Sequence, residues 1–137
     1  MADGNLIQAT PFLGVSDIEQ ALSFYCDVLG FGCFIKQGGY AYLERERVGL
    51  RLLELDDDAP NPFGCSHVYI DLIDAAGLYG ELGNAITALP PERRGGLRNL
   101  PYGQCEFWVR DPDGNLVTFG EGIGANAHQW DYRLEPR

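Results

Sequence analysis

Apolar and polar residues alternate along several short segments of the chain, and a period of two is typical of strands that bury one face. In the first half these segments span residues 8–15, 31–36, 39–44 and 48–55. Residues 18–29, between the first two, instead carry apolar side chains at helical spacing, with Ser16 or Asp17 as the cap and Gly30 after the end. The first half therefore reads as one strand, one helix and three strands.

The second half repeats this order of elements. A strand over residues 67–72 precedes a short helix over 75–82, which we expect to end at Gly83. Strands over 104–110 and 115–120 follow a loop over 90–101 and are joined by the turn Asp111-Pro112-Asp113-Gly114. We predict a single α+β domain over residues 1–122, built from module one (7–55), a polar linker (56–65) and module two (66–122), with a tail over 123–137.

One face of the predicted strands has a composition that suits neither a core nor a solvated surface. It combines aromatic rings, hydroxyl groups, acids and bases, whereas the opposite face is apolar. Aromatic walls with a few placed polar groups are typical of a ligand cavity, and a dimer interface has a similar composition. Both interpretations hold if a dimer builds the cavity. The candidate binding residues on this face are Thr10, Tyr40, Tyr42, Arg51, His67, Tyr69, Glu106, Trp108 and Thr118.

The net charge and the lack of a targeting signal limit the kinds of partner and the compartment that we expect. The 137 residues carry a net charge of −10, which argues against nucleic acid and favours a cationic partner, or simply a solvated acidic surface. We find no signal-peptide pattern and no apolar run of about 20 residues, so we expect no membrane span. The four cysteines form no CxxC pair, and reduced thiols in the cytoplasm are the natural interpretation.

Three groups of residues resemble a known superfamily. They are Val15-Ser16-Asp17-Ile18, Leu29-Gly30-Phe31-Gly32 and the run from Arg110 to Leu116. Their order and spacing are similar to those of the vicinal oxygen chelate superfamily, which includes glyoxalase I, extradiol dioxygenases, fosfomycin-resistance enzymes and bleomycin resistance proteins. The resemblance implies two βαβββ modules that form a curved mixed sheet around a central cup.

Within this superfamily the chain most resembles the bleomycin resistance proteins, through Ala9-Thr10-Pro11, Gly39-Tyr40 and Pro101-Tyr102-Gly103. The resemblance implies that the aromatic residues at Tyr40 and Tyr102 line the drug groove, which adds Tyr102 to the candidate binding residues. Each module presents an open sheet edge and half of the cup, so we also expect a homodimer. In relatives the two halves often come from different chains. We expect the tail, which holds Trp130 and Tyr132, either to lie over the partner or to close the cup.

The metal positions of the superfamily argue against a metal. Carried over, they fall on Thr10, Arg51, His67 and Thr118. Divalent metals need anionic or neutral donors, and a guanidinium has no lone pair to give. Only His67 has a side chain that can bind a metal. The alternative is that His67 lines the cup and is held by a hydrogen bond. We predict no metal, no cofactor and no catalytic residue.

These observations favour a metal-free binding protein of the bleomycin resistance type, with a role in antibiotic resistance. Bleomycin-type drugs combine a planar bithiazole with a cationic tail. Tyrosine rings can stack on the bithiazole, and the acids Asp71 and Glu106 can attract the cationic tail. Two alternatives stay open. One is a metal-dependent lyase, isomerase or dioxygenase of the same superfamily, and the other is an orphan member that binds a different small molecule.

Overall fold

The computed structural model describes residues 4–56, 58 and 64–134, so most of the expected linker lies outside the described residues. The first module forms a four-stranded sheet in the order β1-β4-β3-β2, in which β1 pairs with β4 in parallel and the other neighbours are antiparallel. Its elements are β1 (Phe12–Val15), α1 (Ile18–Leu22) continued by a π-helical segment η1 (Ser23–Val28), β2 (Gly32–Gln37), β3 (Tyr40–Arg45) and β4 (Val48–Glu54).

The second module repeats this topology. Its sheet has the order β5-β8-β7-β6, again with one parallel pair, β5 with β8. The prediction of an α+β fold with two βαβββ modules is therefore confirmed. The elements of this module are β5 (His67–Asp71), α2 (Ala75–Thr87), a 3-10 turn η2 (Pro91–Arg93), β6 (Arg94–Leu100), β7 (Gln104–Arg110) and β8 (Leu116–Gly122).

Both helices begin with the same two carboxylate contacts. The side chain of Asp17 caps α1 by accepting from the backbone N–H groups of residues 19 and 20, and Asp74 caps α2 through the N–H of Gly77. At the end of the neighbouring strand, Glu54 accepts from the N–H of Ile18 at 2.8 Å, and Glu121 accepts from the N–H of Ala75 at 2.9 Å. Each βαβββ unit is therefore closed by a glutamate from its last strand.

Three sequence-based boundaries were wrong. The first strand begins at Phe12 and not at residue 8, because residues 4–11 leave the sheet as an extended arm. The second helix continues through Gly83 to Thr87, since the fully packed Ile86 holds its last turn. The expected loop over 90–101 contains β6, an edge strand whose glycines and arginines have low strand propensity but which pairs along β7.

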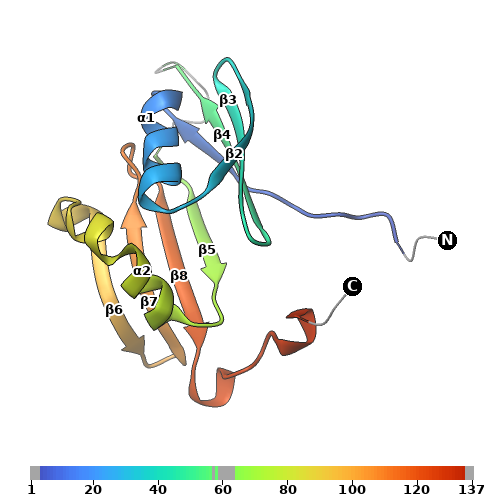
Figure 1. The fold of residues 1–137 in the computed structure, drawn as a ribbon, viewed down its shortest axis with the longest axis vertical. Helices are drawn as coiled ribbons and strands as arrows, with labels where there is room; N and C mark the ends of the chain where they lie inside the picture. Colours follow the sequence, from blue (N-terminus) through green and yellow to red (C-terminus); the bar gives the residue numbers. More distant parts are fainter. Residues whose placement is uncertain (1–3, 57, 59–63, 135–137) are drawn as a thin grey trace.

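The apolar strand face predicted from the alternation is the buried one. The helices lie on one side of the two sheets, and the N-terminal arm and the C-terminal segment lie on the other (Figure 1). Ala9, expected on the core side, is exposed because it belongs to the arm. Neither helix of the described chain is long and apolar enough to cross a membrane. The sheet residues of the core are Leu13, Val15, Ala41, Leu43, Leu50, Leu52, Val68, Ile70, Phe107, Val109, Val117 and Phe119.

A buried polar cluster joins the two modules. Asp111, in the turn between β7 and β8, is fully buried and accepts a hydrogen bond from the hydroxyl of Tyr25 at 2.9 Å. Asn115 donates to Asp111 at 2.8 Å and to the carbonyl of Gly14 at 2.9 Å. Burial, together with the nearby charge of Asp111, raises the pKa of Tyr25. The polar side chains of this turn in module two therefore form hydrogen bonds with the side chain of Tyr25 and with the backbone of module one.

We expect Tyr25→Phe to lower the free energy of unfolding by about 1–3 kcal/mol, because it leaves a buried carboxylate short of one hydrogen bond. Urea unfolding measures this loss. Tyr79→Phe is the matched control, since the half-buried Tyr79 packs its ring on Phe107 and its hydroxyl bonds to none of the described residues. Equal stability of the two variants would contradict the role given to Asp111.

Candidate functional site

The predicted binding residues, together with four neighbours (Gln8, Phe12, Glu44 and Gln104), form two half-sites, one on each module. The first half-site consists of Gln8, Thr10, Phe12, Tyr40, Tyr42, Glu44 and Arg51. The second consists of His67, Tyr69, Tyr102, Gln104, Glu106, Trp108 and Thr118. Gln8 and Thr10 lie in the N-terminal arm and Tyr102 in the turn before β7, and the others lie on the sheet faces opposite the helices. Among the described residues no hydrogen bond or ion pair joins the two half-sites, so the single cup expected from the sequence is not assembled by those contacts within one chain.

Arg51 organises the first half-site. Its Nε donates to Thr10 Oγ1 at 2.7 Å, and its Nη1 donates to the hydroxyl of Tyr40. The guanidinium carbon lies 5.0 Å from the ring centre of Tyr42 and 5.9 Å from that of Phe12, within the range of cation–π contact. Arg51 therefore contacts a hydroxyl, a phenol and two aromatic rings, and forms no ion pair with any described acid.

Tyr42 extends this network along β3. Its hydroxyl donates to Glu44 at 2.6 Å and accepts from the amide of Gln8 at 2.7 Å. The hydrogen bond to Glu44 is the main cause that raises the pKa of Tyr42. Glu44 was not among the predicted site residues, although it shares the strand parity of Tyr40 and Tyr42 and could have been found by that signal.

Glu106 organises the second half-site. Its side chain is buried, with the residue 9% exposed, and its two carboxylate oxygens accept from the hydroxyls of Tyr69 and Tyr102, each at 2.7 Å. Gln104 donates in turn to the hydroxyl of Tyr69 at 2.6 Å. No described cation lies within ion-pair distance of Glu106. The hydrogen-bond donors to the carboxyl group of Glu106 are therefore two neutral phenols.

These contacts change how the two tyrosines ionise. Burial, followed by the hydrogen bond to Glu106 and its charge, raises the pKa of Tyr69 to about 12, although the hydrogen bond from Gln104 lowers it. The hydrogen bond to Glu106 also raises the pKa of Tyr102. Both phenols consequently stay neutral at physiological pH. Their rings remain accessible, since Tyr69 is 40% and Tyr102 is 60% exposed.

The remaining predicted residues lie beside this cluster. His67 and the buried Thr118 form a hydrogen bond of 3.1 Å between Nε2 and Oγ1. Trp108 is half-buried, and the guanidinium carbon of Arg110 lies 5.7 Å from its ring centre. The site thus offers aromatic faces beside hydrogen-bonded polar groups.

The residues at the superfamily's metal positions do not fit a divalent metal. They occur as two pairs on different sheets, Thr10 with Arg51 and His67 with Thr118. A bound guanidinium at one of four positions repels a cation, and hydroxyl groups are weak ligands. Glu54 and Glu121, the acids at the ends of β4 and β8, accept hydrogen bonds from the first turns of the helices and are not on the face of the metal positions. Within the described chain no group of three His, Cys, Asp or Glu side chains is placed to hold a metal.

Glycines on the same sheet face make room for the tyrosines, a feature that the sequence reading missed. A Cβ atom at Gly49 would lie 2.8 Å from the hydroxyl of Tyr42, and one at Gly120 would lie 1.9 Å from that of Tyr69. The two glycines occupy equivalent strands, β4 and β8. Each allows a phenol ring to lie across its sheet, so the arrangement is built into both modules.

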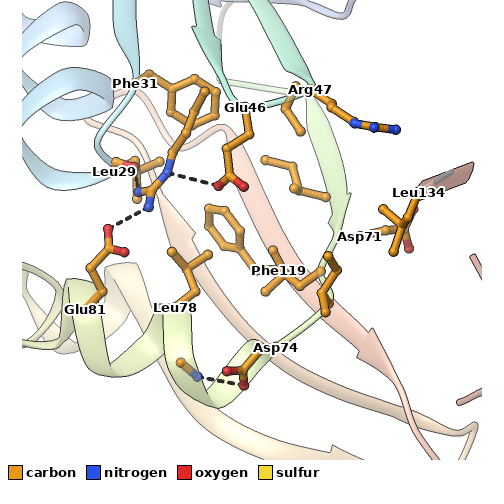
Figure 2. Close-up of a pocket in the computed structure, with 16 residues that line it drawn as sticks. Leu29, Phe31, Glu46, Arg47, Asp71, Asp74, Leu78, Glu81, Phe119 and Leu134 are labelled. Carbon is orange, nitrogen blue, oxygen red and sulfur yellow. Dashed lines mark hydrogen bonds and ion pairs between the residues drawn. The ribbon is translucent and has the colours of Figure 1, made fainter. Parts of the chain in front are cut away.

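Two cavities lie near the half-sites. One of about 450 Å³ lies between the modules and is lined by Leu29, Leu78 and Phe119 with the ion-paired Arg45 and Glu81 (Figure 2). Asp71 also lines it, but none of the residues of the two half-sites does. The other, of about 870 Å³, is bordered by Gln8 of the first half-site and Tyr69 of the second. It is therefore the larger cavity that connects to the candidate site.

We expect Tyr69 to titrate near pH 12 and Glu106→Gln to lower the pKa of both Tyr69 and Tyr102, since it removes the carboxylate that disfavours the phenolates. NMR of isotope-labelled tyrosine measures both values. A raised pKa stabilises the fold below the unfolded value of about 10, and this contribution disappears as the pH rises through about 12. Glu44→Gln is the control, because it affects Tyr42 alone; titration of Tyr69 near pH 10 in the unmodified chain would contradict the geometry.

The comparisons with known proteins agree with this picture. The family model described as "Glyoxalase/Bleomycin resistance protein/Dioxygenase superfamily" matches residues 7–119. The chain is 29% identical over 135 residues to a bleomycin resistance protein of Geobacillus stearothermophilus, covering 86% of this chain and 98% of that protein.

Solved structures agree as well. A bleomycin-binding protein of Streptomyces verticillus, complexed with copper(II)-bleomycin, superposes with a TM-score of 0.70 at 25% identity, covering 88% of this chain and 98% of the other. A lactoylglutathione lyase of Agrobacterium tumefaciens gives a TM-score of 0.65 at 25% identity, covering 87% and 96%. With a family model that matches most of its length, the chain belongs to the glyoxalase/bleomycin resistance protein/dioxygenase superfamily.

Proposed function

We propose that the protein binds and sequesters an aromatic, cationic small molecule of the bleomycin type, without a metal. One observation carries this proposal: at the superfamily's metal positions stands the guanidinium of Arg51, held by Thr10 and Tyr40, while aromatic rings beside it remain accessible. The relatives named as bleomycin resistance and bleomycin-binding proteins support the same ligand class.

The second half-site supports the cationic character of the ligand. The carboxyl group of Glu106 accepts hydrogen bonds from the hydroxyls of Tyr69 and Tyr102, and the rings of these two tyrosines remain exposed to solvent. A planar aromatic group stacks on such rings, and an adjacent cation gains from both the ring faces and the carboxylate. The net charge of −10 favours the approach of a cation over a longer range.

A metal-dependent lyase, isomerase or dioxygenase is the less supported alternative. The lactoylglutathione lyase shares the fold with this chain, but fold alone does not carry an activity. The residues at the metal positions supply one imidazole and no carboxylate, which is too few ligands for Zn²⁺, Fe²⁺ or Mn²⁺. An orphan member that binds another small molecule uses the same half-sites and differs from the main proposal only in its ligand.

We also propose that two copies assemble the complete cup in the cytoplasm. Each chain presents its half-sites on separate sheets, and β5 has a sheet neighbour on one side only. The arm ahead of Pro11 leaves the body of the chain, with Leu6 99% and Ile7 93% exposed (Figure 1). An extended arm with exposed apolar side chains can pack on a second copy of the chain. Cys26, Cys33 and Cys105 form no disulfide, which suits a reducing compartment.

Titration calorimetry with bleomycin tests the ligand. We expect binding by the full chain, weakened about two- to tenfold in Tyr102→Ala through loss of one stacking face. Glu106→Gln should weaken binding as well and reduce its salt dependence, because it removes the negative charge. Tyr79→Phe, on the helix side, is the control. A folded full-length chain that releases no heat with bleomycin would contradict this function.

Sedimentation velocity tests the assembly. We expect the full chain to form a dimer and a variant lacking residues 1–7 to dissociate more readily, because burying Leu6 and Ile7 contributes about 1.5–3 kcal/mol each. Leu6→Ser with Ile7→Ser keeps the arm length and should act in the same direction. A monomeric full-length chain at the concentrations used for calorimetry would refute the shared cup.

A further inference from the structure

The segment after β8 lies beyond the part of the chain that the family model matches, which ends at residue 119. We call residues 123–134 the C-terminal strap. It contains two 3-10 turns, η3 (Gly124–Asn126) and η4 (Asp131–Leu134), linked by backbone hydrogen bonds such as Gln129 N–H to Asn126 and Asp131 N–H to His128. The strap is thus a folded addition to the two modules.

The strap is fixed at both ends. At its start, the amide of Asn126 donates to the carbonyls of Tyr102 and Gly103 at 3.1 and 3.2 Å, and the N–H of Ile123 donates to Gly103 at 3.0 Å. Near its other end, the guanidinium of Arg47 donates to the carbonyl of Arg133. The strap therefore runs from the turn that carries Tyr102, in module two, to the turn between β3 and β4 in module one.

Between these anchors the strap forms one wall of the cavity of about 870 Å³. The other walls come from the root of the N-terminal arm, the start of β4 and the open edge of β5. The volume lies within the range of about 300–1,000 Å³ typical of ligand pockets. The strap residues in this wall are Trp130, Tyr132, Arg133 and Leu134.

The wall contributed by the strap has an aromatic surface. The rings of Trp130 and Tyr132 lie 6.3 Å apart, and the guanidinium carbon of Arg133 lies 5.2 Å and 5.4 Å from their centres. This contact holds the rings in place, yet Trp130 stays 37% exposed. Tyr69, which donates to Glu106, lines the same cavity from β5, and Asp71 adds an acid.

We propose that the strap is part of the ligand site and that Trp130 is a specificity-determining residue that stacks on a planar aromatic group of the ligand. The inference rests on the proposed binding function and extends it to residues outside the matched family region. In this arrangement Tyr69 connects the strap cavity to the acidic half-site. A ligand with an aromatic part and a cation can therefore contact Trp130 and lie beside Glu106 at the same time.

Calorimetry with bleomycin on the full chain tests this inference. We expect Trp130→Ala to weaken binding about two- to tenfold and Trp130→Phe to restore most of it. Gln129→Ala is the matched control, since Gln129 belongs to the strap but is not among the residues that line the cavity of about 870 Å³.

The outcomes separate the two proposals. If the unmodified chain binds bleomycin and Trp130→Ala binds it equally well, the strap is not part of the site. If Trp130→Ala instead changes the sedimentation coefficient and leaves the affinity unaltered, the strap is an interface between copies, which also overturns the inference. Absence of binding by the unmodified chain contradicts the proposed function itself, and the inference then falls with it.

Discussion

The hydrogen bonds of the buried Asp111 are the interaction on which the arrangement of the two modules depends. A carboxylate that is fully removed from water is costly unless its oxygens are satisfied, and here Tyr25, Asn115 and the backbone of its own turn satisfy them. Because Tyr25 comes from module one, the hydrogen bonds of Asp111 in module two are complete only when the two modules pack together. The relative placement of the sheets, and of the half-site on each, follows from this junction.

The internal repeat explains how a binding face is built twice. In each module a glutamate at the end of the last strand caps the helix, so that carboxylate faces the helix and is unavailable to the opposite face. In each module, too, a glycine on the last strand lets a tyrosine lie across the sheet. The half-sites then differ in charge: a guanidinium dominates the first and a carboxylate the second. The two modules therefore share one backbone arrangement and differ in the charged group at the centre of the half-site.

The sequence was sufficient for features that depend on local pattern. Strand parity placed Tyr40, Tyr42, Arg51, Glu106 and Trp108 on the face away from the core, and turn chemistry placed the hairpin at Asp111–Gly114. It failed where tertiary contacts override propensity. The pairing of β6 with β7 makes a strand of a glycine- and arginine-rich segment, and the packing of Ile86 extends α2 past Gly83.

Contacts between residues far apart in the chain were also beyond sequence reasoning. Nothing local in the sequence indicates that Tyr25 meets Asp111, 86 residues away, or that Arg47 meets the carbonyl of Arg133. The alternation likewise suggested one cup, whereas the described contacts form a separate network on each sheet. Whether two chains complete the cup depends on association, which strand parity does not encode.

In the function proposed above, the residues at the superfamily's metal positions form a metal-free site for an aromatic cation. A crystal structure of the chain with bleomycin would test this proposal. We expect electron density for the ligand against Tyr69 and Tyr102, next to Glu106, with Arg51 still bonded to Thr10 and Tyr40. A metal ion bound directly to His67, with Arg51 displaced from its partners, would contradict it.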